Sequence, residues 1–136
     1  AGLRQISLAD TAGHAHPAQV ERLFGAVKLM APDVECTCHF HNTYGLGMAN
    51  VFAALRAGVT TIETSFAGLG GCPFTKVAAG NVATEDVVHA LQRQGDREDV
   101  QLDALVAIAR DVAAHFGREL PGFVHKTGPI AVKERT

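Results

Sequence analysis

The sequence predicts an α/β fold: about three βα units plus a terminal helix, forming the C-terminal portion of a (β/α)8 TIM barrel. Strand-like segments alternate with helical periodicity through short connections, which is typical of parallel βα units with right-handed crossovers. Polar and potentially reactive residues follow all three strands. A doubly wound sheet would explain the order of the elements, but residues of this kind favour the active face of a barrel. A whole barrel takes about 250 residues and eight strands, so these units cannot close one alone.

Composition narrows the class of protein. The 136 residues are 47% hydrophobic, enough for a core, and 12 Lys and Arg against 14 Asp and Glu give a net charge of −2. Without a basic cluster or an apolar run of about 20 residues, we expect no nucleic acid and no membrane as partners. Cys36 and Cys38 on one strand face argue against disulfides and favour a reducing cytoplasm. Because a strand follows Ala1 almost at once, we expect a piece of a longer protein.

The first predicted unit begins with a strand over Arg4–Asp10, which places a carboxylate at the strand's carboxyl end before the loop Thr11–Gly13. Pro17 suits the first turn of a helix, because its missing N–H would be unpaired there in any case. The apolar residues at helical spacing are Val20, Leu23, Phe24, Val27 and Met30. This helix is expected to stop at Ala31–Pro32.

The second predicted unit is a strand over Val34–His41 and a helix over Tyr44–Ala57. Alternation puts Val34, Cys36, Cys38 and Phe40 on one face of the strand and Glu35, Thr37, His39 and His41 on the other. Gly58 suits the left-handed residue that closes a helix. Both histidines are therefore expected to point the same way.

The third predicted unit is a strand over Val59–Phe66, followed by the glycine loop Ala67–Pro73. Thr84 is the expected N-cap of a helix that runs to Gln94, with acidic residues in its first turn. These elements complete the three βα units.

A further amphipathic helix is predicted over Leu102–Phe116. After Gly117 the sequence is punctuated by proline and glycine, so we expect an irregular tail. The predicted organisation is a partial barrel domain over residues 1–117 and an irregular C-terminal tail over residues 118–136.

The sequence His39-Phe40-His41 has the spacing of a metal site, because residues two apart on a strand project to one side. The same spacing also fits two hydrogen-bonded polar side chains at a strand end, and the motif alone leaves both interpretations open. Cys36 and Cys38 alternate away from the histidines and are interpreted as small buried hydrophobes, not as thiolate ligands of zinc.

Two further residues carry candidate chemistry. Cys72 lies in the glycine loop before Pro73, where the backbone can approach a ligand and hold the thiol in position. An incidental loop cysteine is the alternative. Asn81 precedes a predicted helix, where it can cap the helix or offer its carbonyl oxygen to a hard cation. Thr84 already serves the capping need.

Four stretches together are more specific than any of these residues. They are Ser7–Gly13, His39–Gly45, Gly68–Phe74 and Gly80–Asp86. Their order resembles the 3-hydroxy-3-methylglutaryl-CoA lyases, within the larger family of metal-dependent lyases and Claisen-type synthases on (β/α)8 barrels. The resemblance covers nearly all of residues 5–94.

This resemblance implies that His39, His41 and the side-chain oxygen of Asn81 bind a divalent cation, Mg²⁺ or Mn²⁺. It further implies an acyl-CoA substrate that is cleaved to acetyl-CoA and acetoacetate, as in leucine degradation and ketone body formation. Asp10 matches an acidic position near the substrate hydroxyl, and Cys72 matches a loop thiol that protonates the nascent acetyl-CoA carbanion. A homo-oligomer, a dimer, is also implied.

The sequence departs from the family pattern at several positions. Asn42 stands where the lyases have Asp, and His14 and His16 occupy a loop that usually has small residues, which leaves the acyl group open. The pair His14 and His16 is interpreted as an exposed loop pair, not as a second site. The family's remaining metal ligand, an acid next to an arginine on the first barrel strand, has no counterpart here. A missing N-terminal half of the barrel is therefore an expected partner.

Two alternatives remain at the level of sequence. One is an aldolase or Claisen-type synthase of the same barrel family, although the Gly-Gly-Cys-Pro element around Cys72 favours cleavage. The other is a non-catalytic half-barrel that pairs with a separately encoded N-terminal half.

Overall fold

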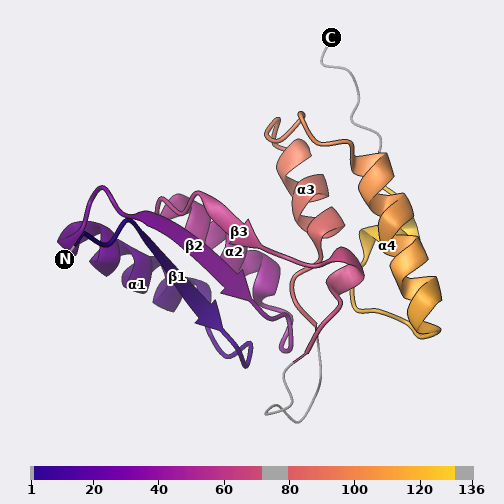
Figure 1. The fold of residues 1–136 in the computed structure, drawn as a ribbon, viewed down its shortest axis with the longest axis horizontal. Coiled ribbons are helices and arrows are strands. Elements are labelled where there is room, and N and C mark those ends of the chain that lie inside the picture. Colours follow the sequence, from indigo (N-terminus) through magenta and orange to yellow (C-terminus); the bar gives the residue numbers. More distant parts are fainter. Residues whose placement is uncertain (1, 72–79, 131–136) are drawn as a thin grey trace. The chain divides into compact units, whose positions relative to one another are not determined.

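The computed structural model describes residues 2–71 and 80–130. Its elements, in chain order, are β1 (Gln5–Asp10), α1 (Pro17–Met30), β2 (Glu35–Phe40), α2 (Gly47–Arg56), β3 (Thr61–Glu63), the short 3₁₀ helix η1 (Phe66–Gly68), α3 (Thr84–Gln92), α4 (Leu102–Phe116) and α5 (Val124–Thr127) (Figure 1). The alternation of strands and helices predicted from the sequence is confirmed. The chain forms two compact units, residues 1–64 with 70–81 and residues 65–69 with 82–136.

The first unit is a parallel sheet in the order β1-β2-β3, and α1 and α2 lie together behind it in Figure 1. The register pairs Asp10 with Phe40 and His39 with Glu63, so the carboxyl ends of the three strands share one edge. The buried hydrophobic side chains of this unit include Val20, Phe24, Val34, Cys36, Cys38, Phe40, Val51, Ala53 and Ala54. Burial of these β-branched, aromatic and thiol side chains stabilises the sheet against its helices.

β1 forms one edge of the described sheet. Its residues alternate between exposed and half-buried, and among the described strands only β2 pairs with it. The predicted stripe of α1 is correct for Val20 and Phe24, but Leu23 and Met30 are 53% and 80% exposed. Their helical spacing predicted burial, and the described residues provide no surface that covers them. This unit has the open edge and exposed apolar side chains of an incomplete barrel.

The second predicted helix begins later than expected, at Gly47 instead of Tyr44. The intervening residues form a turn, in which the Gly45 N–H donates to the Asn42 carbonyl at 3.1 Å. The Asn42 side-chain Oδ1 then accepts the Gly47 N–H at 2.9 Å. Asn42 thus satisfies a donor at the start of α2 that has no partner within the helix.

The ends of the third unit also differ from the prediction. Phe66 belongs to η1 and not to a strand, because Ser65 leaves the sheet and its N–H donates to the Val82 carbonyl at 3.2 Å. The N-cap of α3 is Ala83, so Thr84 is the first helical residue and not the cap. The helix ends at Gln92, two residues before the predicted Gln94.

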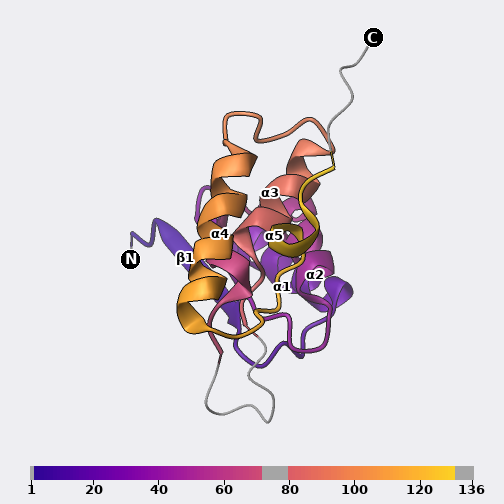
Figure 2. The same ribbon diagram turned by 90° about the vertical axis from the view of Figure 1, so that its right-hand side faces the viewer.

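The second unit contains η1, α3, α4 and α5, and Figure 2 shows α5 beside α3 and α4. The prediction of an irregular tail is wrong for Val124–Thr127, which form α5. Leu120, only 1% exposed, joins Ala67 and Ala109 in a small core. The tail packs because Leu120 fills an apolar site beside Ala67 and Ala109. The prolines and glycines of the tail, on which the prediction was based, do not indicate this contact. The domain boundary at residue 117 remains a prediction. No helix in the described ranges has the length and apolar character to span a bilayer.

Candidate functional site

The candidate site lies at the carboxyl ends of the strands in the first unit. Asp10 ends β1, and its carbonyl accepts the His41 N–H at 3.4 Å. His41 forms an isolated antiparallel bridge with Asn81, and the neighbouring Asn42 N–H donates to the Gly80 carbonyl at 3.1 Å. Backbone pairing therefore brings together two segments that are about forty residues apart in the sequence. Asp10, His41 and Asn81, all singled out from the sequence, lie in this one region.

His39 and His41 lie close together, with ring centroids 5.3 Å apart and ring planes inclined by 57°. Nδ1 of His39 is 3.2 Å from Oε2 of Glu63, its partner in the sheet register. A carboxylate on one ring nitrogen fixes the imidazole and leaves the other nitrogen to face a ligand. Sequence reasoning missed Glu63, whose role becomes visible only when β3 is placed in register with β2.

Nδ1 of His41 is buried and has no hydrogen-bond partner among the residues that the structure describes. A buried polar nitrogen without a partner is rare, because it loses its hydration and gains nothing in return. Burial, and then the neighbouring His39, lower the pKa of His41, whereas Asp10 opposes this shift. The lowered pKa favours the neutral form of the His41 ring, which is the form that binds metals.

Asn81 is packed tightly against the glycine-rich segment. A Cβ built on Gly70 would lie 2.6 Å from Nδ2 of Asn81, and Gly70 has a φ of +114°. Only glycine combines this backbone conformation with the close approach. Within the glycine loop noted in the sequence, position 70 therefore has a physical reason to be glycine, which is the close approach of the Asn81 carboxamide.

The Asp10 carboxylate organises the loop after β1. Its Oδ1 accepts the His14 N–H and its Oδ2 accepts the Ala15 N–H, both at 2.9 Å. This structural role was not predicted from the sequence. Each carboxylate oxygen has a further lone pair, so Asp10 can still accept a hydrogen bond from a substrate.

His14 and His16, in the loop after β1, make contacts that differ from those of His39 and His41. His16 is the N-cap residue of α1, and its N–H donates to Oε1 of Gln19 at 3.2 Å. The exposed His14 ring lies 5.3 Å from the ring of Tyr44, which is 67% exposed. This contact places two aromatic groups on adjoining loops, and no pattern in the sequence predicts it.

The thiols of β2 are fully buried, and burial raises the pKa of Cys38 to about 12. A thiol that resists ionisation is a poor metal ligand, in agreement with the expectation that Cys36 and Cys38 pack as small hydrophobes. Within residues 2–71 and 80–130, no cluster of three His, Cys, Asp or Glu side chains is arranged to hold a metal. Cys72 lies outside the described residues.

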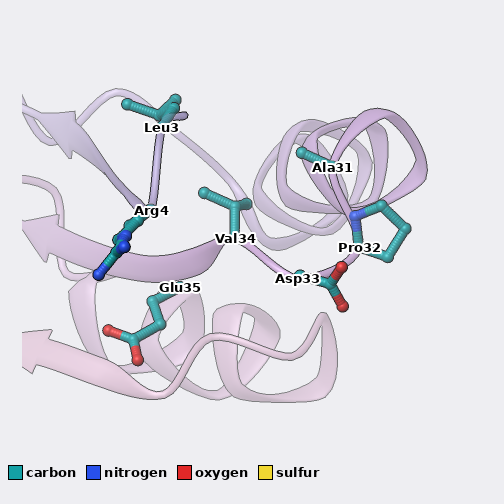
Figure 3. A pocket seen from close by; sticks show the side chains of 7 residues that line it. All are labelled: Leu3, Arg4, Ala31, Pro32, Asp33, Val34 and Glu35. Atoms are coloured by element: carbon teal, nitrogen blue, oxygen red, sulfur yellow. The ribbon is translucent and has the colours of Figure 1, made fainter. Parts of the chain in front are cut away.

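A groove at the opposite, amino ends of the strands is shown in Figure 3. Its polar lining comes from Arg4 just before β1, from Asp33 on the connection from α1 to β2, and from Glu35 at the start of β2. In parallel barrels this end serves stability and the carboxyl end carries chemistry. The groove therefore does not compete with the site at His39 and His41.

Comparison with known proteins decides the family. A sequence profile described as HMGL-like matches residues 1–112. The chain belongs to the HMGL-like family. It is 43% identical over 129 residues to (R)-citramalyl-CoA lyase of Chloroflexus aurantiacus, covering 95% of this chain and 41% of that protein. It is 39% identical over 120 residues to hydroxymethylglutaryl-CoA lyase of Bacillus subtilis, covering 88% of this chain and 40% of that protein.

Solved structures of the HMGL-like family confirm the fold. A structure of an HMG-CoA lyase from Acinetobacter baumannii, in complex with coenzyme A and 3-methylmalate, matches 99% of this chain and 44% of its own with a TM-score of 0.87 and 39% identity. The Bacillus subtilis HMG-CoA lyase structure matches 93% of this chain and 42% of its own, with a TM-score of 0.86. The chain is thus part of a TIM barrel and spans about two fifths of the length of these relatives. The resemblance seen in the sequence is confirmed.

Proposed function

We propose that the chain is the C-terminal part of a divalent-metal carbon–carbon lyase. The substrate is 3-hydroxy-3-methylglutaryl-CoA, or a close 3-hydroxyacyl-CoA analogue, and the products are acetyl-CoA and acetoacetate or the corresponding oxo compound. The observation that carries the proposal is the pair of imidazole rings 5.3 Å apart beside Asn81, in which Nδ1 of His41 is buried without a partner among the described residues. The family and the named lyases among its relatives support the same reaction class.

The residues present fit a hard or borderline divalent cation such as Mg²⁺ or Mn²⁺. Two imidazole nitrogens and one amide oxygen are a mixed N and O donor set, and the Glu63 carboxylate on His39 is a typical outer partner of a metal-binding histidine. The bound ion would act as a Lewis acid toward the oxygens of the substrate. His39, His41 and Asn81 are assigned to hold it.

The remaining roles are assigned to Asp10 and Cys72. Asp10 is assigned to accept a hydrogen bond from the substrate hydroxyl, whose proton leaves as the adjacent carbon–carbon bond breaks and a ketone forms. The bonding electrons pass to the α-carbon of the thioester. Cys72 donates its thiol proton to that carbon, which gives acetyl-CoA and a thiolate. The thiol is then restored by the proton lost from the hydroxyl, so the reaction balances without an oxidant or reductant.

The half-barrel nature of the chain supports a second element of the proposal, which is pairing with an N-terminal barrel half. The open edge of β1 and the exposed Leu23 and Met30 are surfaces that the rest of a barrel would cover. The free cysteines Cys36 and Cys38 agree with the cytoplasmic location expected from the sequence. That location and the dimeric state remain predictions.

Product analysis on the full-length protein tests the proposal. HMG-CoA and citramalyl-CoA would be incubated separately with the metal-free protein and with the protein supplied with Mn²⁺. We expect Mn²⁺-dependent release of acetyl-CoA and an oxo acid from at least one thioester, and loss of this release in His39→Ala and His41→Ala. Condensation of acetyl-CoA with an oxo acid, without measurable cleavage, would support the synthase alternative instead.

A further inference from the structure

The loop after β1 is held in place by the residue that is assigned to the substrate hydroxyl. The Asp10 carboxylate accepts the N–H groups of His14 and Ala15, and both donor–acceptor distances are 2.9 Å. From α2, Nδ2 of Asn50, a residue that is 0% exposed, donates to the Ala15 carbonyl at 2.9 Å. Hydrogen bonds from two elements therefore fix the backbone that carries the His14 side chain.

A close approach brings this loop against the turn after β2, beside which it lies in Figure 1. A Cβ built on Gly13 would lie 2.9 Å from Cβ of Thr43, and the φ of Gly13 is +72°. Only glycine combines this left-handed conformation with so short a separation. His14 and Tyr44 are the next residues of the two segments, and their ring centroids lie 5.3 Å apart with planes inclined by 47°. The contact of the two rings thus follows from the packing of the two segments.

The ring pair is exposed and is not part of a core. His14 is exposed, and Tyr44 is 67% exposed. Ring contacts at this spacing are favourable and restrict the conformations of both side chains. Because neither ring is buried, the need to fill a core does not account for the pair. It presents an imidazole of restricted orientation at the carboxyl edge of the sheet, where the candidate site lies.

His14 lies within reach of a substrate that is bound at Asp10. The 2.9 Å hydrogen bond and the N–Cα bond of about 1.5 Å place the His14 Cα within about 4.4 Å of Oδ1 of Asp10. In HMG-CoA and in citramalyl-CoA, the acyl carboxylate is attached to the hydroxyl-bearing carbon directly or through a single methylene group. A substrate hydroxyl that is bonded to Asp10 therefore brings the acyl carboxylate near the His14 imidazole.

An acyl carboxylate in this place needs a hydrogen-bond donor. It would lie near the negative charge of Asp10, and like charges that share a site disfavour each other. The described lysines and arginines of the first unit lie before β1 or in helices, and not in the loops after the strands. They are Arg4, Arg22, Lys28 and Arg56. An imidazole has an N–H donor in both of its protonation states. His14, which the cation does not use, can provide this hydrogen bond.

We propose that the His14 imidazole, oriented by the Tyr44 ring, donates a hydrogen bond to the free carboxylate of the acyl group. His14 is then a specificity-determining residue, and the substrate class is a 3-hydroxyacyl-CoA whose acyl group carries a carboxylate. This inference rests on the proposed function, because it takes the position of the substrate from the hydrogen bond to Asp10. The competing interpretations are that His14 contacts a phosphate of coenzyme A or only shapes the loop.

The test uses the full-length protein with Mn²⁺ and whichever of HMG-CoA and citramalyl-CoA it cleaves. The matched ligand is 3-hydroxy-3-methylbutyryl-CoA, in which a methyl group replaces the carboxymethyl group of HMG-CoA or the carboxylate of citramalyl-CoA. Its inhibition constant is measured together with that of free coenzyme A. For His14→Ala we expect kcat/KM to fall by at least about tenfold, the usual effect of losing a hydrogen bond to a charged group. Neither inhibition constant should change. His14→Gln should restore part of kcat/KM, because its amide N–H can donate.

His16→Ala is the matched control for His14→Ala. His16 is exposed in the same loop, and its backbone N–H, which donates to Oε1 of Gln19 at 3.2 Å, remains in alanine. We expect His16→Ala to leave kcat/KM unchanged. Tyr44→Phe keeps the ring beside His14 and should also leave kcat/KM unchanged, whereas Tyr44→Ala should lower it.

An unchanged kcat/KM in His14→Ala would overturn the inference. A rise in the inhibition constant of 3-hydroxy-3-methylbutyryl-CoA as large as the loss of kcat/KM would also overturn it, because His14 would then act without the acyl carboxylate. An equal rise for free coenzyme A would instead assign His14 to a phosphate. In these three cases the wild-type protein still releases acetyl-CoA, so the proposed function stands. A wild-type protein that cleaves neither thioester would refute the proposed function and this inference together.

Discussion

Gly70→Ala tests the site with the smallest change in composition. The added Cβ would lie 2.6 Å from Nδ2 of Asn81, whereas real Cβ atoms keep at least 3.0 Å from their neighbours, so the carboxamide must move by about 0.4 Å or more. The φ of +114° adds backbone strain of about 1–3 kcal/mol for a residue with a Cβ. Because a displacement of about 1 Å costs about a hundredfold in rate, a displacement of about 0.4 Å or more should reduce turnover by at least about sixfold.

The assay combines Mn²⁺ binding, followed by electron paramagnetic resonance, with chemical denaturation of the same full-length protein. Gly25→Ala is the matched control, because its Cβ would have no neighbour within 4 Å and it lies inside α1. There alanine should stabilise the helix by about 0.5–1 kcal/mol. Gly70→Ala should weaken Mn²⁺ binding, and Gly25→Ala should not. Unchanged Mn²⁺ affinity in a Gly70→Ala protein of normal fold would refute the assignment of Asn81 as a ligand.

Three further predictions follow from individual contacts. Glu63→Gln should weaken Mn²⁺ binding by about tenfold, because it removes the carboxylate that contacts His39. Glu35→Gln, at the far end of β2, should leave Mn²⁺ binding unchanged. Equal Mn²⁺ affinities of the two variants in titrations would contradict this prediction. Because burial raises the pKa of Cys38 from 9.0 to about 12, its contribution to stability is complete below pH 9 and falls as the pH rises toward 12. The loss of stability at pH 10 is on the order of 1 kcal/mol, and urea unfolding should show a smaller loss in Cys38→Ala. Phe24→Ala should lower the free energy of unfolding by about 3–5 kcal/mol in any form of the protein, because Phe24 is buried. Leu23→Ala should lower it by less than about 1 kcal/mol in residues 1–136 alone and by more in the full-length protein. Unfolding curves of both variants measure these changes.

The elements of the first unit could be predicted because each leaves a periodic signal. Alternation over Val34–His41 and helical spacing over α1 reflect which side chains are buried, and burial is what the pattern records. The shared direction of His39 and His41 follows from the same alternation. Exposure of Leu23 could not be foreseen, because periodicity predicts an apolar face and does not reveal what covers it.

Features that depend on contacts between distant residues escaped prediction. The contact of Glu63 with His39 requires the register of two strands, and the left-handed Ala67 requires Glu85 and Gly122. The loop-shaping role of Asp10 depends on two backbone N–H groups whose direction no motif specifies. The helical turn α5 forms because Asp86 caps its first N–H groups, a partner 38 residues away from Val124.

The measurement that tests the central claim most directly is acetyl-CoA release from HMG-CoA by residues 1–136, assayed alone and with an added N-terminal barrel half. The ion is expected to bind weakly in residues 1–136, because the two imidazoles and one amide provide no charged ligand and the described residues hold no cluster that could replace it. We therefore expect little or no release by the chain alone, and saturable, Mn²⁺-dependent release once the N-terminal half is added. Turnover by monomeric residues 1–136 alone, or no turnover by the reconstituted barrel, would contradict the account.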